Sequence, residues 1–440
     1  MRGSDIGSTG WFPVARATEV GSSPVPVGAG GAAYVLVRLR PGGEVTAFPA
    51  RCPHRLVPLA AGTVSGGRLQ CPYHGWRFDS EGRCVDIPSL GPTGTPPPRA
   101  DLDMPWAVEE KHGWVWLAPE RTTSPVPAQP SAAPQPAPEP PDPAGRVFGN
   151  LDPSLEHAWH PVALSRELRA GGWLQVRLLG RTWKLRRDGD DVTAEPPAYG
   201  VREQFGVIWL APAEPTDVEL ELPEAADRRF VTGWLPPVRS PGPAGPLADT
   251  FLDATHGAFV HASTIGGSPA AAVDPGDVAA DQVVAEPGGF SSVQEQWCDN
   301  PLDPEVATGG RPLRQRRRTT YTYRAPFQLR LRQEFLDSGA ATTLLYLLQP
   351  EDLDSTRIYV CVLLSAGPGR RLPPPATVGE QVALQLRILE EDVRSQEMLA
   401  VSGLPLDRRD EVHVPGDARG VALRQALCDF MAEGRRQLAA

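Results

Sequence analysis

The sequence lacks any apolar run long enough to span a bilayer. Its N-terminal stretch, MRGSDIGSTGWFPVA, also lacks the apolar segment of a secretory signal. We therefore expect a cytoplasmic protein without a membrane partner.

Positive charge is outnumbered, with 43 lysines and arginines against 53 aspartates and glutamates, and it is not clustered. Lysine occurs only at Lys111 and Lys184, the formal net charge is −10, and the longest basic run is three arginines at 316–318. Nucleic-acid-binding surfaces need clustered positive charge, so this pattern argues against nucleic acid as a natural partner.

Cysteine is scarce as well, with six in 440 residues. Four of them are scattered without the spacing of a disulfide framework, and we expect free thiols at Cys84, Cys298, Cys361 and Cys428. The remaining two each stand in a short loop with a histidine.

These two loops are the most informative motif. Cys52 and His54 belong to the word CPH, and Cys71 and His74 belong to CPYH, with residues 55–70 between them. A Rieske-type 2Fe-2S cluster needs two thiolates on one iron and two imidazoles on the other, which two such loops supply. The alternatives are a structural zinc site and a coincidental disulfide. Finger-type zinc sites usually pair cysteine with cysteine and histidine with histidine, so the spacing favours the cluster.

The length allows two or three domains, and a hydrophobic content of 41% is ordinary for a globular protein. Residues 1–119 contain short strand patterns separated by turn signals and predict an all-β domain. Residues 120–145 are rich in proline and predict an extended, semi-rigid linker. Two further units follow, at 146–225 and 226–440.

Residues 146–225 resemble the first domain in the order of their sequence words. HAWHPVALSREL at 157–168 resembles GWFPVARATEV at 10–20, and FGVIWLAPAEP at 205–215 resembles HGWVWLAPER at 112–121. The segment between them contains no cysteine and no histidine. We interpret this unit as a degenerate, cluster-less Rieske-like β domain; the alternative is chance recurrence of strand patterns rich in valine, tryptophan and glycine.

Residues 226–440 combine antiparallel strand patterns with helical ones, so the chain as a whole is predicted to be α+β. A helix is expected over 377–401, with Thr377 as its N-cap and Glu380 completing a capping box. A second helix is expected near 417–437.

A second metal site is indicated by two histidines that follow two aspartates. Asp249, Asp253, His256 and His261 lie within the word DTFLDATHGAFVH. Two histidines and one carboxylate form the facial triad that holds ferrous iron and leaves positions open for substrate and dioxygen. On a straight helix the two histidines would point about 140° apart, so the helix must end or bulge between them, and Gly257 is a plausible place.

The helix over 377–401 offers the third ligand. Helical winding places Asp392 inside an apolar arc, whereas its neighbours Glu390 and Glu391 fall outside it. A carboxylate on an apolar face is costly unless it is paired or metal-bound. Asp392 is therefore the predicted ligand, and a buried salt bridge is the alternative.

Taken together, CPHR, CPYHGW, the D-x-x-x-D-x-x-H-x-x-x-x-H word and the late EED helix resemble the oxygenase component of Rieske non-heme iron oxygenases. The resemblance is strongest to the single-subunit-type branch, which includes O- and N-demethylases, aryl-amine oxygenases and prodiginine cyclases. It implies an N-terminal Rieske domain and a C-terminal helix-grip-like catalytic domain. The Pro-rich linker and the repeat depart from the family pattern, because members usually run almost directly from the Rieske domain to the iron helix.

The resemblance also assigns roles. Cys52, His54, Cys71 and His74 would hold the 2Fe-2S cluster, and the mononuclear Fe(II) ligands would be His256, His261 and Asp392. Asp253 would be the catalytic bridging carboxylate, joining an iron-binding histidine to His74 of a neighbouring subunit. That role implies a homotrimer, because the two metals of one chain would be too far apart.

The implied activity is oxidation of a hydrophobic or aromatic small molecule, by hydroxylation or demethylation, with O2 and with electrons from a ferredoxin or flavin reductase. Apolar aromatic side chains of the C-terminal domain suit such a substrate: Phe259, Phe327, Phe335 and Tyr346. Three alternatives remain open. One is oxidative cyclisation or desaturation without oxygen insertion. Another is an electron-transfer protein without catalysis of its own, and the third is a pathway scaffold with residual metals.

Overall fold

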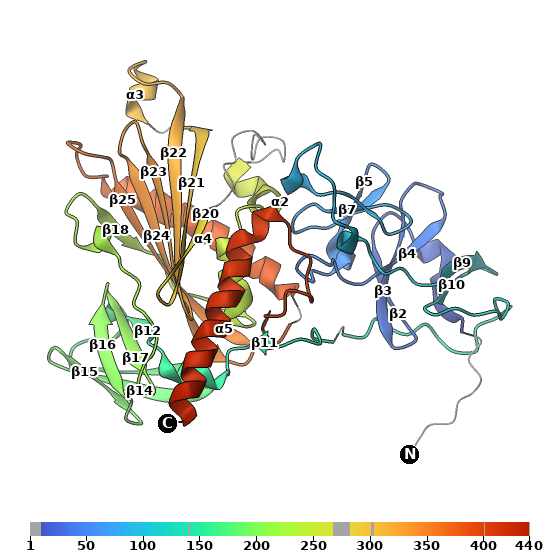
Figure 1. The fold of residues 1–440 in the computed structure, drawn as a ribbon, viewed down its shortest axis with the longest axis horizontal. Helices are drawn as coiled ribbons and strands as arrows, with labels where there is room; N and C mark the ends of the chain where they lie inside the picture. Colours follow the sequence, from blue (N-terminus) through green and yellow to red (C-terminus); the bar gives the residue numbers. More distant parts are fainter. Residues whose placement is uncertain (1–9, 140, 267–281, 301–302, 400, 440) are drawn as a thin grey trace.

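A computed structural model describes residues 10–139, 141–266, 282–300, 303–399 and 401–439, and has an α+β fold (Figure 1). The first nine residues, which carry part of the expectation about a secretory signal, lie outside the described residues. Among the described residues, no helix is long and apolar enough to cross a membrane.

The N-terminal domain is built from three small antiparallel sheets, ordered β1-β10-β9, β2-β3-β4 and β5-β6-β7-β8. Their strands are β1 (Phe12–Arg16), β2 (Val25–Ala29), β3 (Ala32–Arg38), β4 (Val45–Pro49), β5 (Thr63–Ser65), β6 (Arg68–Gln70), β7 (Arg77–Phe78), β8 (Cys84–Asp86), β9 (Ala107–Lys111) and β10 (Trp114–Ala118). The two Cys/His loops follow β4 and β6, on one side of this domain.

The linker is fixed at both of its ends. The backbone N–H of Gly28 in β2 donates to the carbonyl of Gln135 at 3.1 Å, so the linker extends a sheet of the N-terminal domain. Further on, the Asp142 side chain accepts from the backbone N–H of Ser402 at 3.1 Å. Strand β11 (Val147–Phe148) then pairs with β26 (Leu404–Pro405) of the C-terminal domain.

A second β domain follows the linker, with sheets ordered β12-β17-β16 and β13-β14-β15. Its strands are β12 (His160–Leu164), β13 (Trp173–Leu178), β14 (Arg181–Asp188), β15 (Asp191–Glu195), β16 (Gly200–Gln204) and β17 (Val207–Ala211).

The β12-β17-β16 sheet repeats the β1-β10-β9 sheet in detail. Both first strands shift register just after a proline, between Pro13 and Ala15 and between Pro161 and Ala163. A bulge at the same place in two sheets of the same order is a specific geometric likeness, because bulges fix where a strand bends.

Side-chain contacts repeat as well. The ring N–H of Trp116 donates to the carbonyl of Lys111 at 3.2 Å, and that of Trp209 donates to the carbonyl of Gln204 at 3.3 Å. Each tryptophan ring therefore bonds across the hairpin to which it belongs, and the turns of the two hairpins have the same length.

The C-terminal domain contains one eight-stranded antiparallel sheet, ordered β18-β25-β24-β23-β22-β21-β20, with β19 also paired to β25. Its strands are β18 (Val231–Trp234), β19 (Val238–Pro241), β20 (Gln282–Glu286), β21 (Gly289–Asp299), β22 (Arg314–Arg324), β23 (Gln328–Phe335), β24 (Ala341–Asp352) and β25 (Ser355–Ser365). Its helices are α1 (Ala244–Leu252), α2 (Gly257–Val260), α3 (Pro304–Ala307), α4 (Pro375–Glu397) and α5 (Ala418–Ala439).

The two faces of this sheet have different partners. Apolar residues of α1, α4 and α5 pack on one face, as in the contacts of Leu247, Leu389 and Leu427 with the sheet core. The second β domain packs on the other face, where Trp209 joins a cluster with Tyr359 of β25. Figure 1 shows the N-terminal domain on the opposite side of α5 from this second domain.

Helix α4 begins earlier than the sequence pattern predicts. Its N-cap is Pro374, with Pro375 in the first turn, so the expectation of Thr377 as N-cap was wrong. Proline is favoured in the first turn because its missing N–H is not needed there. The final helix, expected near 417–437, is α5.

Candidate functional site

The two Cys/His loops have the same backbone fold. The N–H of Cys52 donates to the carbonyl of Val57 at 2.9 Å. The N–H of Cys71 donates to the carbonyl of Trp76, also at 2.9 Å. Each turn passes through a left-handed residue four positions after its cysteine, at Leu56 in the first loop and Gly75 in the second.

This symmetry brings the four predicted cluster ligands together. The His54 and His74 rings lie 4.3 Å apart between centroids, and the two thiols lie in hydrogen-bond contact. Burial raises the pKa of the Cys52 thiol, whereas its hydrogen bond to Cys71 lowers the pKa of the Cys71 thiol. All six cysteines of the chain are free thiols, which confirms the prediction for the other four and removes the disulfide alternative.

The donor set fits a 2Fe-2S cluster. His54 Nδ1 is buried and has no hydrogen-bond partner, which leaves its lone pair free for a metal, while Nε2 of the same ring lies 3.0 Å from Asp417 Oδ1. A ligand imidazole held by a carboxylate on its far nitrogen is a common arrangement at metal sites. Asp417 was not found from the sequence, because 363 positions separate it from His54.

The second predicted metal site is also assembled. His256 Nε2 and His261 Nε2 are 3.1 Å apart, and Asp392 Oδ1 lies 3.4 Å from the first and 3.1 Å from the second. One ligand atom from each of the three residues falls within 4.8 Å of the others.

A short helix, α2, lets the two histidines point toward one metal although they are five residues apart. Helix α1 ends at Leu252, His256 caps the N-terminus of α2, and His261 caps its C-terminus with φ −104° and ψ 20°. Helix α2 therefore begins at Gly257, where the sequence suggested an interruption, and the two imidazoles converge from its ends.

The electrostatics of this trio suit a divalent metal. Burial alone would lower the pKa of His256, but the hydrogen bond and charge of Asp392 outweigh it and raise that pKa above its usual range. Burial would raise the pKa of Asp392, but its contacts with both histidines lower it instead. Asp392 Oδ1 is buried without a well-oriented hydrogen bond, so a metal at this point would satisfy it.

Glu391 is a site residue that the sequence did not predict. Its Oε2 lies 2.8 Å from His261 Nδ1, and its other oxygen accepts from Thr264. Helical winding predicted that Glu391 lies outside the apolar face. It is rotated by only about 100° from its neighbour Asp392, so its side chain still reaches the edge of the site.

A carboxylate and a tyrosine connect the two sites. Asp253 Oδ2 accepts a hydrogen bond from His74 Nε2, and its Oδ1 accepts from the N–H and hydroxyl of Thr255 at 2.6 and 2.7 Å. The charge and the backbone of Asp253 also act on the His256 ring, where both help to raise its pKa. The Tyr73 ring lies 5.9 Å from the His256 ring, and its hydroxyl is 2.6 Å from Thr250 Oγ1.

The resemblance predicts that Asp253 meets His74 of a neighbouring subunit, and in this chain it meets His74 of the same chain. Which subunit supplies this histidine in an assembly stays a prediction.

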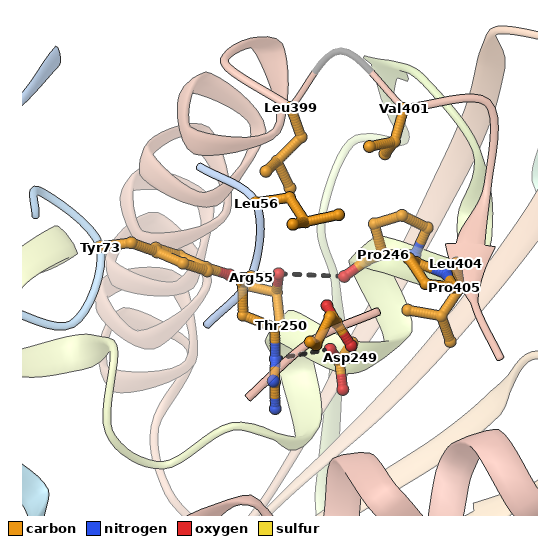
Figure 2. Close-up of a pocket in the computed structure, with 11 residues that line it drawn as sticks. Arg55, Leu56, Tyr73, Pro246, Asp249, Thr250, Leu399, Val401, Leu404 and Pro405 are labelled. Atoms are coloured by element: carbon orange, nitrogen blue, oxygen red, sulfur yellow. Dashed lines mark hydrogen bonds and ion pairs between the residues drawn. The ribbon is translucent and has the colours of Figure 1, made fainter. Parts of the chain in front are cut away.

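A buried ionic network lies near the residues that connect the two sites. Arg55 pairs with Asp249 at 3.1 Å and with Asp417 at 3.0 Å, and Arg424 pairs with Asp249 at 3.0 Å and with Glu411 at 2.6 Å. Figure 2 shows Arg55 reaching Asp249 beside Thr250. Although burial would lower it, these acidic neighbours raise the pKa of the Arg55 guanidinium, so Arg55 remains charged.

Comparison with known proteins identifies both parts. The family model for the Rieske [2Fe-2S] domain matches residues 10–97. The model for the vanillate O-demethylase oxygenase C-terminal domain matches residues 243–433.

The chain belongs to the Rieske oxygenases.

Two curated relatives each match about a quarter of the chain. Methylxanthine N1-demethylase NdmA of Pseudomonas putida is 40% identical over 111 residues, covering 24% of this chain and 31% of its own length. The oxygenase subunit of 3-chlorobenzoate-3,4-dioxygenase from Comamonas testosteroni is 46% identical over 109 residues, covering 24% of this chain and 25% of its own. The chain thus matches less than a third of the length of these relatives.

Solved structures can be aligned along nearly the whole chain. Dicamba monooxygenase bound to 3,6-dichlorosalicylic acid aligns with 96% of both chains, at 16% identity and a TM-score of 0.43. The 2Fe-2S cluster and the mononuclear iron predicted from the sequence are the cofactors of a Rieske oxygenase with this domain pair.

Proposed function

We propose that this Rieske oxygenase hydroxylates or demethylates a hydrophobic or aromatic organic molecule. The observation that carries the proposal is the convergence of His256, His261 and Asp392 beside His74. The matched C-terminal family and the demethylase relative favour demethylation.

Each residue has a proposed role. Cys52, His54, Cys71 and His74 hold the cluster, and His256, His261 and Asp392 hold the iron. When bound, the cluster supplies single electrons and the iron supplies a site for dioxygen. Asp253 holds the Nε2 proton of His74, and Glu391 fixes the orientation of the His261 ring.

The reaction consumes one dioxygen, two electrons and two protons for each substrate. One oxygen atom replaces a C–H bond by C–OH, and the other leaves as water. On an O- or N-methyl group the resulting hemiacetal or carbinolamine breaks down to formaldehyde. A ferredoxin or a flavin reductase is the proposed electron donor, and oxidoreductase NdmD of Pseudomonas putida is a further relative, 34% identical over 107 residues.

The substrate class rests on the apolar character of the C-terminal domain. Phe327 and Tyr346 belong to the core of that domain, with Tyr346 stacked on Phe251 at 4.4 Å. Phe259 instead lies against Gly75 of the Rieske domain. Phe259 therefore contributes to the contact between domains, and the substrate preference depends on the other aromatic residues.

We also propose that residues 146–225 are a copy of the Rieske domain that has no cluster loops, between a linker at 120–145 and a catalytic domain at 226–440. The shared bulge, strand order and tryptophan contacts support this duplication. A cytoplasmic location and a homotrimer, which the sequence and the family resemblance suggest, are parts of the same proposal.

Metal analysis tests the core of the proposal. The purified protein should hold about three irons and two sulfides per chain, and His256→Ala should hold about two irons with an unchanged cluster spectrum and no turnover. An electron carrier would already hold only two irons in the unmodified chain. His112→Asn, at an exposed turn of the Rieske domain, is the control and should keep all three irons.

Formaldehyde release tests the reaction type. O- and N-methylated aromatic compounds, supplied with a chemical or enzymatic reductant, should yield formaldehyde in proportion to oxygen consumed. Oxygen consumption with loss of two hydrogens from substrate and no oxygen inserted would instead support cyclisation or desaturation.

A further inference from the structure

The three arginines at 316–318 point to two different sides of the large sheet. Arg316 and Arg318 lie on the side away from the helices, where both pair with Glu295 at the surface. Side chains alternate along a strand, so Arg317 lies on the helix-facing side, which it shares with Tyr321 of the helix-packed core. Among the described residues, Arg317 has no ion pair, and its Nε is buried without a hydrogen-bond partner.

We infer that the helix-facing side of this sheet carries a polar subsite for the substrate, where Arg317 binds the carboxylate of an elongated aromatic acid. The inference rests on the proposed function, because the other end of that molecule must reach the iron ligands. It adds a charged group and a length to the substrate class given above.

Strand register shows which side chains lie beside Arg317 in the neighbouring strands β21, β22 and β23 (Figure 1). Gln296 of β21 lies directly opposite Arg317. In the next row, Thr319 lies between Gln294 of β21 and Gln333 of β23. Directly opposite residues of antiparallel strands point to the same side of the sheet. These five side chains therefore form one patch on the helix-facing side, which we call the polar strip.

The polar strip lacks internal partners. Thr319 is 5% exposed, and its hydroxyl is buried without a hydrogen-bond partner. Within the part of the chain that the structure describes, the three glutamines of the strip form no side-chain hydrogen bond. The opposite side of the sheet differs, since Arg330 and Arg332 both pair there with Glu224. Buried polar groups are nearly always hydrogen-bonded, so the unpaired groups of the strip indicate a partner from outside the chain.

An apolar row lies next to the polar strip on the same side of the sheet. Tyr321, Leu331 and Leu344 are directly opposite one another in β22, β23 and β24. All three belong to or pack against the core that faces the helices. The flat side chain of an aromatic ligand suits such a row, and its polar end would then meet Thr319 and Arg317.

The iron ligands lie beyond this apolar row, near Tyr346. The Tyr346 ring stacks on Phe251 of α1 with 4.4 Å between centroids, and burial and the charge of Asp392 raise the pKa of its hydroxyl. Thr342, four residues before Tyr346 in β24, lies opposite Gln333 of the polar strip. Four residues of strand span about 13 Å. A molecule that reaches from the iron ligands to the strip is therefore as long as a pair of linked rings.

The chemistry of the polar strip selects an anion. The planar guanidinium of an arginine forms two parallel hydrogen bonds with a carboxylate. The hydroxyl of Thr319 and the amides of the glutamines can donate to the same group. An amine would instead bring a second positive charge beside Arg317. Arg317 is thus a specificity residue that binds the far end of the substrate and does not touch the reacting atoms.

A matched pair of ligands tests the inference. The acid probe is a methoxybiphenyl carboxylate with its two groups at opposite para positions, and the second probe is its uncharged primary amide. Binding of each to the metal-loaded protein is measured by calorimetry without dioxygen or reductant. The acid should bind about 10- to 100-fold more tightly than the amide, the usual effect of a hydrogen bond to a charged group. Equal binding of the two probes, or binding of neither, would overturn the inference.

Variants assign the preference to Arg317. Arg317→Gln should abolish the preference for the acid, and Arg317→Lys should restore part of it. Arg316→Gln is the matched control, because Arg316 belongs to the same triplet but points to the other side, and it should keep the preference. A preference that survives in Arg317→Gln would refute the assignment. If that variant does not fold, the nearly isosteric Thr319→Val replaces it. Its affinity for the acid should fall about fivefold, and an unchanged affinity would count against the subsite.

Binding and turnover distinguish this inference from the proposed function. If the acid binds through Arg317 but no bound acid is oxidised when dioxygen and reductant are supplied, the subsite stands and the oxygenase function fails. If the amide is oxidised as fast as the acid, the function stands and the subsite fails.

Discussion

Replacing Arg55 by methionine tests how strongly the Rieske domain is held. The substitution keeps most of the apolar side-chain length but removes the cation that pairs with Asp249 and Asp417. Among the residues that the structure describes, Asp249 retains Arg424 as a partner, whereas Asp417 retains His54 and the N–H of Val414. The variant thus leaves a buried carboxylate without its cation.

Breaking a buried ion pair by removing one partner costs about 3–5 kcal/mol. At about 1.4 kcal/mol for each tenfold change, docking of the domain should weaken by about 100- to 4,000-fold. We expect the cluster signal to disappear at lower denaturant concentration than in the parent chain, separately from the unfolding of the catalytic domain.

The assay is chemical denaturation of the holoprotein, followed by visible circular dichroism for the cluster and by tryptophan fluorescence. Arg83→Met is the matched control, because Arg83 pairs with Glu81 at the surface and both side chains are more than 60% exposed. Exposed pairs contribute about 0–1 kcal/mol. If Arg55→Met shifts the cluster transition no more than this control, the network does not hold the domain.

Three further changes have expected outcomes. Burial raises the pKa of Asp217 to about 7, so the folded state keeps a proton that the unfolded chain loses near pH 4. Stability should therefore fall by up to about 4 kcal/mol from pH 4 to pH 8 relative to Asp217→Asn, and parallel pH curves of unfolding free energy would contradict this. Glu391→Gln should weaken Fe(II) binding about 10- to 100-fold in a metal titration, because His261 loses its orienting carboxylate, whereas exposed Glu390→Gln should not. Gly75→Ala should lower the melting temperature of the cluster-bearing protein, since φ is +68° and an added Cβ would overlap the Phe259 ring; an unchanged melting temperature would show that this loop is not packed as described.

The ligand sets could be predicted from sequence because metal chemistry limits the residue types and their spacing. Asp392 was found because a carboxylate inside an apolar helical arc needs a partner. The same arc excluded Glu391, although a long side chain at the edge of an arc still reaches the site. Asp417 gave no local signal, because its role depends on docking between segments that are distant in the sequence.

Domain placement was the part that local patterns could not determine. The repeat was visible because strand and turn residues recur in order, but nothing in a single strand indicates which surface it will cover. The contact between His74 and Asp253 joins residues 179 positions apart, so no local pattern could place them together. Long-range packing, here the ionic network around Arg55, brings their segments side by side.

The burial of both cluster histidines has a consequence for the electron donor. Donor proteins must approach a redox centre closely, yet the His54 and His74 side chains are almost entirely buried, each beside a carboxylate of the catalytic domain. The donor's binding surface must then lie on another face of the Rieske domain, or the domain must detach for each reduction.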